Sequence, residues 1–461
     1  MTLLPANAAQ PWGRVPGVLF IALLVGLSAC TSSTGHAERV TRPNIIVFVT
    51  DDQRATGTLG VMPETRRLFV EGGTTYPNAY STTPYCCPSR ASIFTGRYTH
   101  NHRMYRRADE TPDFDQSATL QRYLQESGYR TAMFGKYLNG WDLSADPPYF
   151  DDWAIFSKST LGGYVGGEWN VDGKTMTVER YTTTYLRRLA VRFARSAAKE
   201  DRPWALFIST GAPHRPFVAE PKYEDAAVPR WDPQRSGFME RDVSDKPRFL
   251  KGFKVTESQV RATRAAQLRT LMSVDDMVED LYGTLQELGE ERDTLSFFLS
   301  DNGFAWGEQH ILGKMVPYTL SVRVPMMVRW PVGLESGKVD DRLAATIDVA
   351  PTVLDAAGIE ADDYIDGRSL LDRSRQRDRI LTEFWHFHGR PTWESLRTED
   401  YQYARYYDPD GNLTFEEYYD LGDDPGETTN LVVDGVVEEV DLSRIRGLLA
   451  TDMECRGSQC P

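Results

Sequence analysis

The stretch CCPSRASIFTGR, residues 86–97, places two adjacent cysteines directly before a proline, a serine and an arginine. Pro88 suits the first turn of a helix, so the stretch predicts a helix over residues 89–95 whose positive end points back at Cys86. A thiol at that position is expected to be acidified, and Arg90 and unpaired backbone N–H groups are expected to stabilise an anion beside it. The start of the predicted helix is therefore a candidate anion site.

Two other interpretations of this stretch stay open. Free cysteines are most often buried, so a structural pair at a helix start is the simplest alternative. A redox thiol of the CxxC kind is less favoured, because Cys86 and Cys87 are adjacent and no further cysteine lies nearby in the sequence.

Polar residues follow four short apolar runs, at residues 44–49, 131–134, 204–208 and 295–299. Continuous apolar runs of this length are typical of strands buried on both faces. Helical patterns lie between them, at residues 120–124 and at residues 256–288, which open on a capping-box pattern. The alternation predicts an α/β fold with a large, mostly parallel sheet sandwiched by helices.

In such a sheet, ligands collect at the carboxyl ends of the strands, so the polar residues that follow the strands should share one crevice. Carboxylate and carboxamide oxygens suit a hard cation such as Ca²⁺ or Mg²⁺ better than zinc. Two further acids, Asp275 and Asp276, fall in the middle of the long helical segment and are expected on a solvated or interdomain face. The residues predicted to meet in the crevice are Asp51, Asp52, Lys136, His214, Asp301 and Asn302.

A smaller unit is expected after residue 378. Short strand patterns separated by turns predict a small antiparallel sheet, and a helix is expected around residues 443–450. The strand patterns lie at residues 380–383, 395–398, 401–405 and 418–421. The predicted division is a signal segment over 1–29, a tether over 30–42, a main domain over 43–378 and a C-terminal subdomain over 379–461.

The first thirty residues have the pattern of an export signal. Arg14 precedes an apolar run at residues 18–25 that is too short to span a bilayer. Leu27-Ser28-Ala29-Cys30 resembles a bacterial lipobox, whose cysteine is lipidated after cleavage. We therefore expect an exported protein held at the bacterial cell surface by a lipid on Cys30, its only contact with a membrane. A plain signal peptide and a secreted or periplasmic protein are the alternative.

The formal net charge of −14 argues against nucleic acid as a partner. An acidic protein can still bind an anion by concentrating cationic side chains or a metal ion in one place. Cys455 and Cys460 are close enough in sequence to clip the C-terminal tail in an oxidising compartment, but their pairing cannot be deduced from the sequence.

The pattern Cys86-x-Pro88-Ser89-Arg90, followed by Thr95-Gly96-Arg97, closely resembles the signature of type I sulfatases of the alkaline phosphatase-like superfamily. The resemblance extends from Pro43 to the DPGETTNL segment at residues 424–431, nearly the whole chain after the tether. Residues 135–139, 212–216 and 313–314 look most like the N-acetylglucosamine-6-sulfatase branch. In this family the first cysteine is oxidised to formylglycine, so the resemblance implies a formylglycine-generating enzyme as a partner.

Carried over residue by residue, the resemblance implies a site with two parts. Calcium is bound by one set of residues, Asp51, Asp52, Asp301, Asn302 and an oxygen of the modified Cys86. The sulfate is surrounded by a second set, Arg90, Lys136, His214 and Lys314. These types suit the chemistry, because a sulfate monoester is anionic and its oxygens must be neutralised before a hydroxyl can attack sulfur. His214 and Lys314 are expected beside the leaving oxygen, which needs a proton.

The formylglycine hydrate has two hydroxyls: one attacks sulfur, and the other expels sulfate by re-forming the carbonyl. Many sulfatases place a histidine three residues after the lysine of the Gly-Lys motif as the base for that second step. This chain has Asn139 there, and an amide is not a base near neutral pH. Asn139, His388 and Arg390 are candidate contacts to a sugar carrying an acidic group.

The sequence thus predicts a calcium-dependent sulfatase acting on a sulfated sugar such as 6-O-sulfated N-acetylglucosamine. The nearest alternative is a phosphodiester or phosphonate monoester hydrolase of the same superfamily. A non-catalytic lipoprotein that binds sulfated glycans is the alternative of another class.

Overall fold

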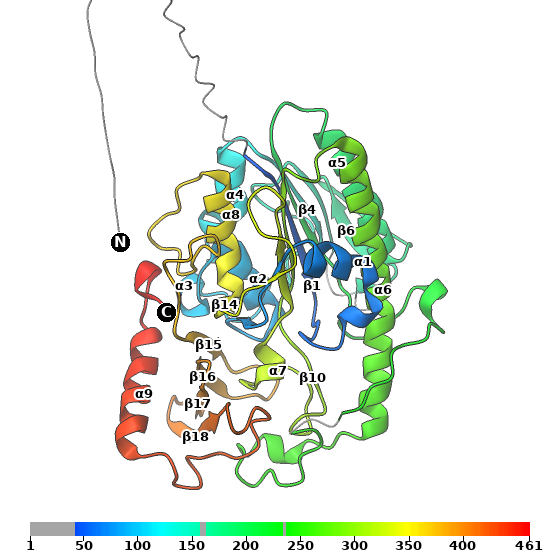
Figure 1. Ribbon diagram of the computed structural model, residues 1–461. Coiled ribbons are helices and arrows are strands. Elements are labelled where there is room, and N and C mark those ends of the chain that lie inside the picture. Colours follow the sequence, from blue (N-terminus) through cyan, green and yellow to red (C-terminus); the bar gives the residue numbers. More distant parts are fainter. Residues whose placement is uncertain (1–41, 157–162, 234–236) are drawn as a thin grey trace, which may run out of the picture. The chain divides into compact units, whose positions relative to one another are not determined.

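The computed structural model describes residues 42–156, 163–233 and 237–461. The predicted signal segment, Cys30 and the predicted tether up to residue 41 lie outside the described residues. The ribbon in Figure 1 shows one large sheet with helices against it, and a smaller sheet that carries the C-terminal helix. Among the described residues, no helix combines the length and the apolar character needed to cross a membrane.

The large sheet has ten strands in the order β13-β2-β12-β9-β1-β8-β4-β5-β6-β7. Its centre, from β9 to β5, is parallel, and β12, β6 and β7 run antiparallel to their neighbours. The predicted fold class is confirmed. The strands are β1 (Asn44–Thr50), β2 (Thr74–Thr75), β4 (Arg130–Gly135), β5 (Asp152–Phe156), β6 (Glu168–Val171), β7 (Lys174–Thr177), β8 (Trp204–Ser209), β9 (Thr294–Ser300), β12 (Met326–Arg329) and β13 (Lys338–Val339).

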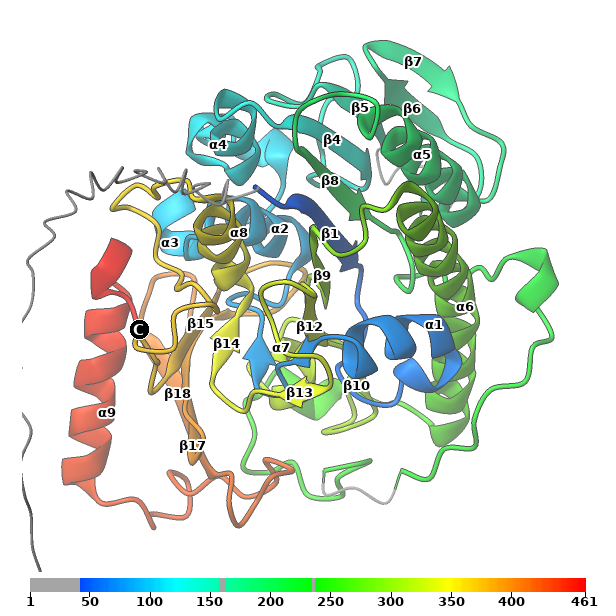
Figure 2. The same cartoon turned by 45° about the horizontal axis from the view of Figure 1, so that its top comes forward.

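Helices cover both faces of this sheet (Figure 2). Side chains alternate along β1, so Ile45, Val47 and Val49 pack with α2, α4 and α8, while Ile46 and Phe48 pack with α5 and α6. The helices are α1 (Pro63–Thr65), α2 (Cys86–Thr95), α3 (Thr99–His102), α4 (Leu120–Glu126), α5 (Thr182–Ala197), α6 (Glu257–Leu288), α7 (Thr319–Val322), α8 (Val349–Ala357) and α9 (Glu439–Asp452).

The α2 helix differs from the prediction at its start. It begins at Cys86, three residues earlier than expected, because Tyr85 is extended and Pro88 lies inside the first turn. The helix ends at Gly96, which has a left-handed φ of 66° and lies so close to Ile365 that a Cβ atom would approach that side chain to 2.9 Å. A side chain at residue 96 would therefore disturb both the helix end and its packing.

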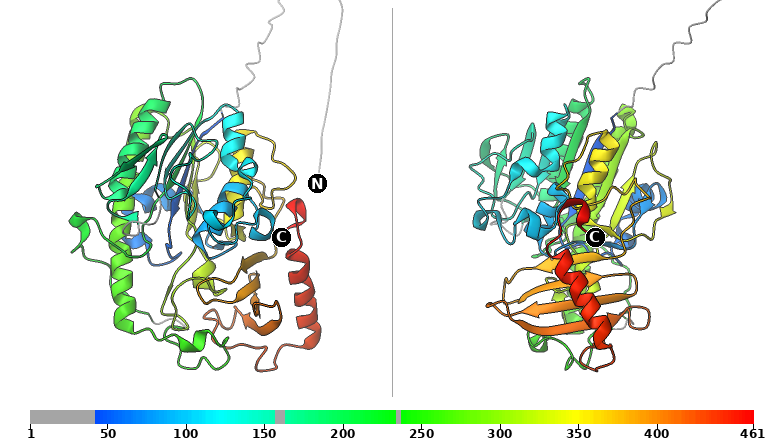
Figure 3. Two further views of the ribbon diagram at one scale, coloured as in Figure 1. Left: turned by 180° about the vertical axis from the view of Figure 1, so that it is seen from behind. Right: turned by 90° about the vertical axis from the view of Figure 1, so that its left-hand side faces the viewer.

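The C-terminal part forms the predicted antiparallel sheet, in the order β15-β16-β17-β18. Figure 3 shows α9 lying across one face of these strands. The strands are β15 (Ile380–Phe384), β16 (Thr392–Arg397), β17 (Tyr401–Tyr407) and β18 (Leu413–Asp420). Two short pairs complete the strands, β10 (Ala305–Trp306) with β11 (Leu312–Gly313) and β3 (Ala79–Tyr80) with β14 (Ala344–Ala345). Cys455 and Cys460 form a disulfide bond.

Candidate active site

Asp51 and Asp52 meet Asp301 and Asn302 because the strands that precede the two pairs are neighbours. β1 and β9 pair in parallel with Thr50 opposite Ser300, so residues 51–52 and 301–302 leave the sheet side by side. The Asp52 backbone N–H donates to Asp301 Oδ1 at 3.2 Å, and Asn302 Nδ2 donates to Asp52 Oδ1 at 2.8 Å. All four side chains are almost fully buried. The strand register therefore brings together residues that are 250 positions apart.

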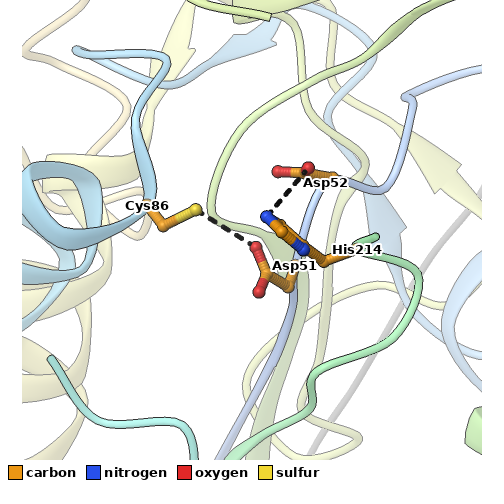
Figure 4. A group of neighbouring side chains, drawn as sticks. All are labelled: Asp51, Asp52, Cys86 and His214. Carbon is orange, nitrogen blue, oxygen red and sulfur yellow. Dashed lines mark hydrogen bonds and ion pairs between the residues drawn. The ribbon is translucent and has the colours of Figure 1, made fainter. Parts of the chain in front are cut away.

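The α2 helix places Cys86 against these acids (Figure 4). Its Sγ lies 3.2 Å from Asp51 Oδ1 and 2.8 Å from Lys314 Nζ. The thiol of the neighbouring Cys87 instead donates to the Asn139 carbonyl at 3.6 Å. Of the two adjacent cysteines, Cys86 is therefore the one that faces the acidic cluster.

Three buried cations surround Cys86 and the acids. Arg90 Nε donates to Asp301 Oδ2 at 2.9 Å, and its Nη1 donates to the Lys136 carbonyl and to Ser209 Oγ. Lys136 Nζ lies 2.5 Å from Asp51 Oδ2. Lys314 Nζ contacts Asp52 Oδ1, and lies 3.0 Å from Asn302 Oδ1. Every cation predicted from the sequence is thus in contact with the cluster.

His214 closes the cluster from the loop after β8 (Figure 4). Its Nε2 lies 3.8 Å from Asp52 Oδ2, and its Nδ1 lies 2.6 Å from the Arg215 carbonyl. A carbonyl only accepts, so Nδ1 carries the ring proton there. Tyr164 fixes this loop, because its hydroxyl donates to the His214 carbonyl at 2.7 Å.

Burial and ion pairing shift the pKa values of this cluster. Burial raises the pKa of the Cys86 thiol and the Asp51 carboxylate raises it further, which outweighs the opposing effect of the two lysines. The expected acidification of this thiol is therefore wrong for an unmodified Cys86. Burial also opposes the charge on Asp52, but Lys314 and His214 bring the pKa of that carboxyl below its usual value.

The donor atoms of the cluster fit a hard divalent cation. Ligand atoms of Asp51, Asp52, Cys86 and His214 all lie within 4.8 Å of one another. Asp301 Oδ1 adjoins Asp52, and Asn302 Oδ1 shares the Lys314 ammonium with Asp52 Oδ1. Oxygen donors in this number are typical of Ca²⁺ rather than of zinc. The three carboxylates balance the charge of the three basic side chains, so a bound divalent cation would leave a net positive site that suits an anionic ester.

The three predicted substrate contacts differ in their burial and in their neighbours. The Asn139 side chain is nearly buried and its Oδ1 has no hydrogen-bond partner in the described part of the chain. His388 is exposed and packs on Phe387, whose ring lies 4.9 Å from that of Tyr85, the residue before Cys86. Arg390 stacks on Phe253, 4.4 Å from the ring centre, and contacts none of the cluster residues through a hydrogen bond or ion pair that the described residues show.

Two residues that hold the site were not singled out from the sequence. Ser209 accepts a hydrogen bond from Arg90, and Tyr164 holds the His214 loop. Ser209 carries a signal that could have been used, because it ends an apolar run as the other site residues do. Tyr164 lies in an irregular segment and carries none.

Several other polar residues near the site are structural. His100 pairs with Glu383 at 2.9 Å, and His102 Nε2 lies 3.0 Å from Ser92 Oγ. Glu308 forms a buried ion pair with Arg54 at 3.0 Å.

Comparison with known proteins identifies the family. Residues 43–359 match the family model described as Sulfatase, and residues 307–451 match one described as N-sulphoglucosamine sulphohydrolase, C-terminal. The chain belongs to the sulfatase family. The sequence-based recognition is confirmed, and membership places the chain among the sulfuric ester hydrolases.

The similarity to this chain extends over different shares of the relatives' own lengths. Human N-acetylglucosamine-6-sulfatase is 30% identical over 502 residues, which cover 95% of this chain and 89% of that protein. An extracellular sulfatase SULF-1 homolog of Drosophila melanogaster is 33% identical over 375 residues, 77% of this chain, but this sulfatase spans only 33% of that relative.

Two solved structures show how widely the fold is shared. One protein, solved with its substrate D-glucosamine-2-N,6-O-disulfate, superposes with a TM-score of 0.73 at 23% identity and covers 90% of this chain and 97% of its own. A phosphonate monoester hydrolase from Silicibacter pomeroyi superposes with a TM-score of 0.71 at 22% identity, covering 90% and 96%. At these identities the likeness concerns the fold alone.

Proposed function

We propose that this sulfatase hydrolyses sulfate monoesters with formylglycine at position 86 and calcium bound beside it. The observation that carries the proposal is the position of Cys86, whose Sγ lies within 3.2 Å of an acidic oxygen and 2.8 Å of the Lys314 ammonium in a buried cluster. A nucleophile beside buried carboxylates can act only if an anionic ester can approach it. The surrounding cations attract the ester and offset the repulsion from the carboxylates.

Two groups would be supplied to this site. Formylglycine contributes, as its hydrate, a hydroxyl nucleophile with a second hydroxyl on the same carbon, and calcium contributes fixed positive charge. The residues that would hold calcium are Asp51, Asp52, Asp301, Asn302 and the modified residue 86. Asp52 Oδ1 and Asn302 Oδ1 both contact the Lys314 ammonium, and Asp301 Oδ1 accepts from the Asp52 backbone N–H.

The basic side chains of the chain orient and neutralise the sulfate. Arg90 is held by Asp301, by the Lys136 carbonyl and by Ser209, so its guanidinium cannot rotate away. Lys136 and Lys314 approach the cluster through different carboxylates. Positive charge that is fixed before the reaction needs no reorganisation as charge develops on the sulfate oxygens.

His214 is placed to handle the proton of the leaving group. Its Nδ1–H is directed to the Arg215 carbonyl, so a neutral ring presents Nε2 as an acceptor. A protonated ring would present Nε2–H instead, balanced by Asp52 at 3.8 Å, and could protonate a leaving oxygen. Lys314 is the second donor within reach of the nucleophile position.

The substrate we propose is a sulfated sugar such as 6-O-sulfated N-acetylglucosamine within a glycosaminoglycan. The similarity to human N-acetylglucosamine-6-sulfatase over 95% of this chain supports it. Asn139, His388 and Arg390 are the proposed contacts to the sugar. We further propose a formylglycine-generating enzyme as the partner that modifies Cys86, and export with a lipid anchor at Cys30.

Peptide mass spectrometry tests the mechanism most directly. Protein made together with a formylglycine-generating system should carry an aldehyde, trappable by a hydrazide, at residue 86 and not at residue 87. Cys86→Ala should abolish release of sulfate from 6-O-sulfated N-acetylglucosamine, whereas Cys87→Ala, with its thiol directed away from the cluster, should retain modification and turnover. Full activity in Cys86→Ala would refute the mechanism.

A phosphonate or phosphodiester hydrolase is the second candidate, because a phosphonate monoester hydrolase shares the fold at a TM-score of 0.71. Turnover of an aryl sulfate and of an aryl phosphonate by the modified protein should be compared side by side. A large preference for the phosphorus ester would overturn the proposed substrate class. Modified protein that binds sulfated saccharides but turns over none of them would instead indicate the non-catalytic glycan-binding lipoprotein.

A further inference from the structure

The exposed face of α5 carries a row of cations outside the active site. Arg188, Arg192, Arg195 and Lys199 are all exposed and are spaced four, three and four residues apart. At 100° per residue they project within an arc of about 60°, and at 1.5 Å per residue they span about 16 Å. Lys199 follows the helix end but continues its last turn, because its N–H bonds the Ser196 carbonyl. We call these four residues the basic row.

The orientation of the basic row is fixed by the opposite face of the helix. Leu186, Leu189, Ala190, Phe193 and Ala194 are buried against the large sheet, so α5 cannot roll and hide its cations. Figures 1 and 2 show α5 beside α6 at the outside of the sheet. Residues 182–199 contain no acidic residue, although the whole chain has a formal net charge of −14.

Three of the four cations of the basic row have no counterion among the described residues. Arg195 pairs with Glu287 at 2.5 Å. In contrast, Arg188, Arg192 and Lys199 form no side-chain hydrogen bond or ion pair anywhere in the described ranges. A surface hollow of about 610 Å³ lies along them, and Arg187 and Asp280, which pair at 3.2 Å, also line it. Five cations and one acid thus line this groove, so its net charge is positive and suits an external anion.

The basic row starts close to the active-site end of α5. The N–H of Thr182, the first residue of the helix, donates to the Tyr164 carbonyl at 2.7 Å, and the Tyr164 hydroxyl holds the His214 loop. Arg188 lies six residues, about 9 Å, along the helix from that point, and Lys199 about 25 Å. The row thus runs from the neighbourhood of the active-site loop away from it.

We propose that the basic row binds a linear sulfated polysaccharide, so that the preferred substrate is a polymer and not a single sugar. The proposal rests on the sulfatase function proposed above. Guanidinium groups bind sulfate oxygens through paired hydrogen bonds, and a straight row of them suits a chain with anionic groups along its length.

An anionic membrane fits the basic row less well. Helices that lie on membranes insert apolar side chains beside their cations. The apolar side chains of α5 are buried in the large sheet, and Val191, the apolar residue that lines the hollow, is itself half-buried. The exposed face of α5 therefore carries positive charge but no exposed apolar side chain that could insert into a membrane.

The test compares two triple variants of the full, modified, calcium-loaded protein. One is Arg188→Gln with Arg192→Gln and Lys199→Gln, which neutralises the unpaired cations of the row. The control neutralises three exposed cations elsewhere in the fold and so changes the net charge equally. Its substitutions are Arg66→Gln, Arg375→Gln and Arg444→Gln.

Binding to a heparin oligosaccharide is the first readout. We expect the row variant to bind about tenfold more weakly at about 0.15 M salt, with a shallower salt dependence, and the control to bind as the parent does. Equal weakening in both variants would show a net-charge effect and overturn the proposal. Unchanged heparin binding in the row variant, with weaker binding to vesicles of phosphatidylglycerol and phosphatidylcholine, would assign the row to a membrane and also overturn it.

Kinetics provide the second readout and separate the two proposals. The row variant should raise KM for heparin by a similar factor, while kcat and the kinetics on 6-O-sulfated N-acetylglucosamine stay unchanged. If no form hydrolyses either substrate but heparin binding falls in the row variant alone, the proposed catalysis is refuted and polysaccharide binding by the basic row is supported. If both variants hydrolyse both substrates equally and bind heparin equally, polysaccharide binding by the row is refuted and the proposed catalysis is supported.

Discussion

Glu427 is predicted to make the stability of this protein fall as the pH rises toward neutrality. Burial raises the pKa of this carboxyl from 4.5 to about 7, although Arg397 and hydrogen bonds from Thr319 oppose the rise. The side chain is 2% exposed and lies 3.7 Å from Arg397. Its carboxyl accepts from the Thr319 backbone N–H, so it holds the segment at residues 424–431 against α7.

The sign and size of the effect follow from proton linkage. Below pH 4.5 the carboxyl is protonated in both the folded and the unfolded chain, and burial costs nothing extra. Between pH 4.5 and about 7 the unfolded chain releases the proton while the folded chain keeps it, so the free energy of unfolding falls. A pKa shift of this size lowers the free energy of unfolding by about 3 kcal/mol. The whole loss is reached once the pH exceeds the pKa of the folded chain.

Glu427→Gln removes this titration and keeps the shape of the side chain. We expect the thermal midpoint of the variant, relative to the parent, to rise between pH 5 and pH 8, measured at one fixed scan rate because a chain of this size need not unfold reversibly. Glu399→Gln, an exposed position in the turn between β16 and β17, is the matched control and should show no such change. If the difference in thermal midpoint between Glu427→Gln and the parent stays constant from pH 5 to pH 8, the reasoning is refuted.

Three further predictions concern other parts of the molecule. Arg377→Met should lower the free energy of unfolding by about 3–5 kcal/mol, because it leaves the Asp348 carboxylate buried without the partner that now binds it through two contacts of 2.7 Å; the exposed Arg375→Met should change it little. Removing calcium with a chelator should lower the thermal midpoint and abolish sulfate release, because a cation that binds only the folded chain stabilises it and adds positive charge to the site; an unchanged midpoint and rate would contradict the calcium site. Cys30→Ala should move the protein from the membrane fraction to the soluble or unprocessed fraction, and unchanged fractionation would leave only a plain signal peptide.

Much of the fold was predictable because its strands are continuous apolar runs. The predicted runs at residues 44–49 and 295–299 lie within β1 and β9, and the capping box at Thr256 and Gln259 is present at the start of α6. The acids that meet at the site were predictable for the same reason, since each pair follows directly on a strand. Local sequence signals were enough wherever a residue sits at the end of such an element.

Sequence reasoning failed where long-range packing decides a side chain's surroundings. Asp275 was expected on a solvated or interdomain face, but it is 6% exposed and accepts hydrogen bonds from the backbone N–H groups of Glu64 and Thr65. An acid in the middle of one helix thus caps another, and no periodicity in residues 256–288 contains that information. Likewise, the stacking of Arg390 on Phe253 depends on how the C-terminal sheet meets a loop from the main domain.

The burial of Cys86 has a consequence for timing. Its side chain is 1% exposed, at the start of a helix that is itself entirely buried. A second protein cannot reach that sulfur once β1 and β9 have paired and α2 has docked on them. If residue 86 is oxidised by a partner enzyme, that enzyme must act while the segment is still an extended peptide. Folding and modification are then competing processes, and a molecule that folds first is left with an unmodified cysteine.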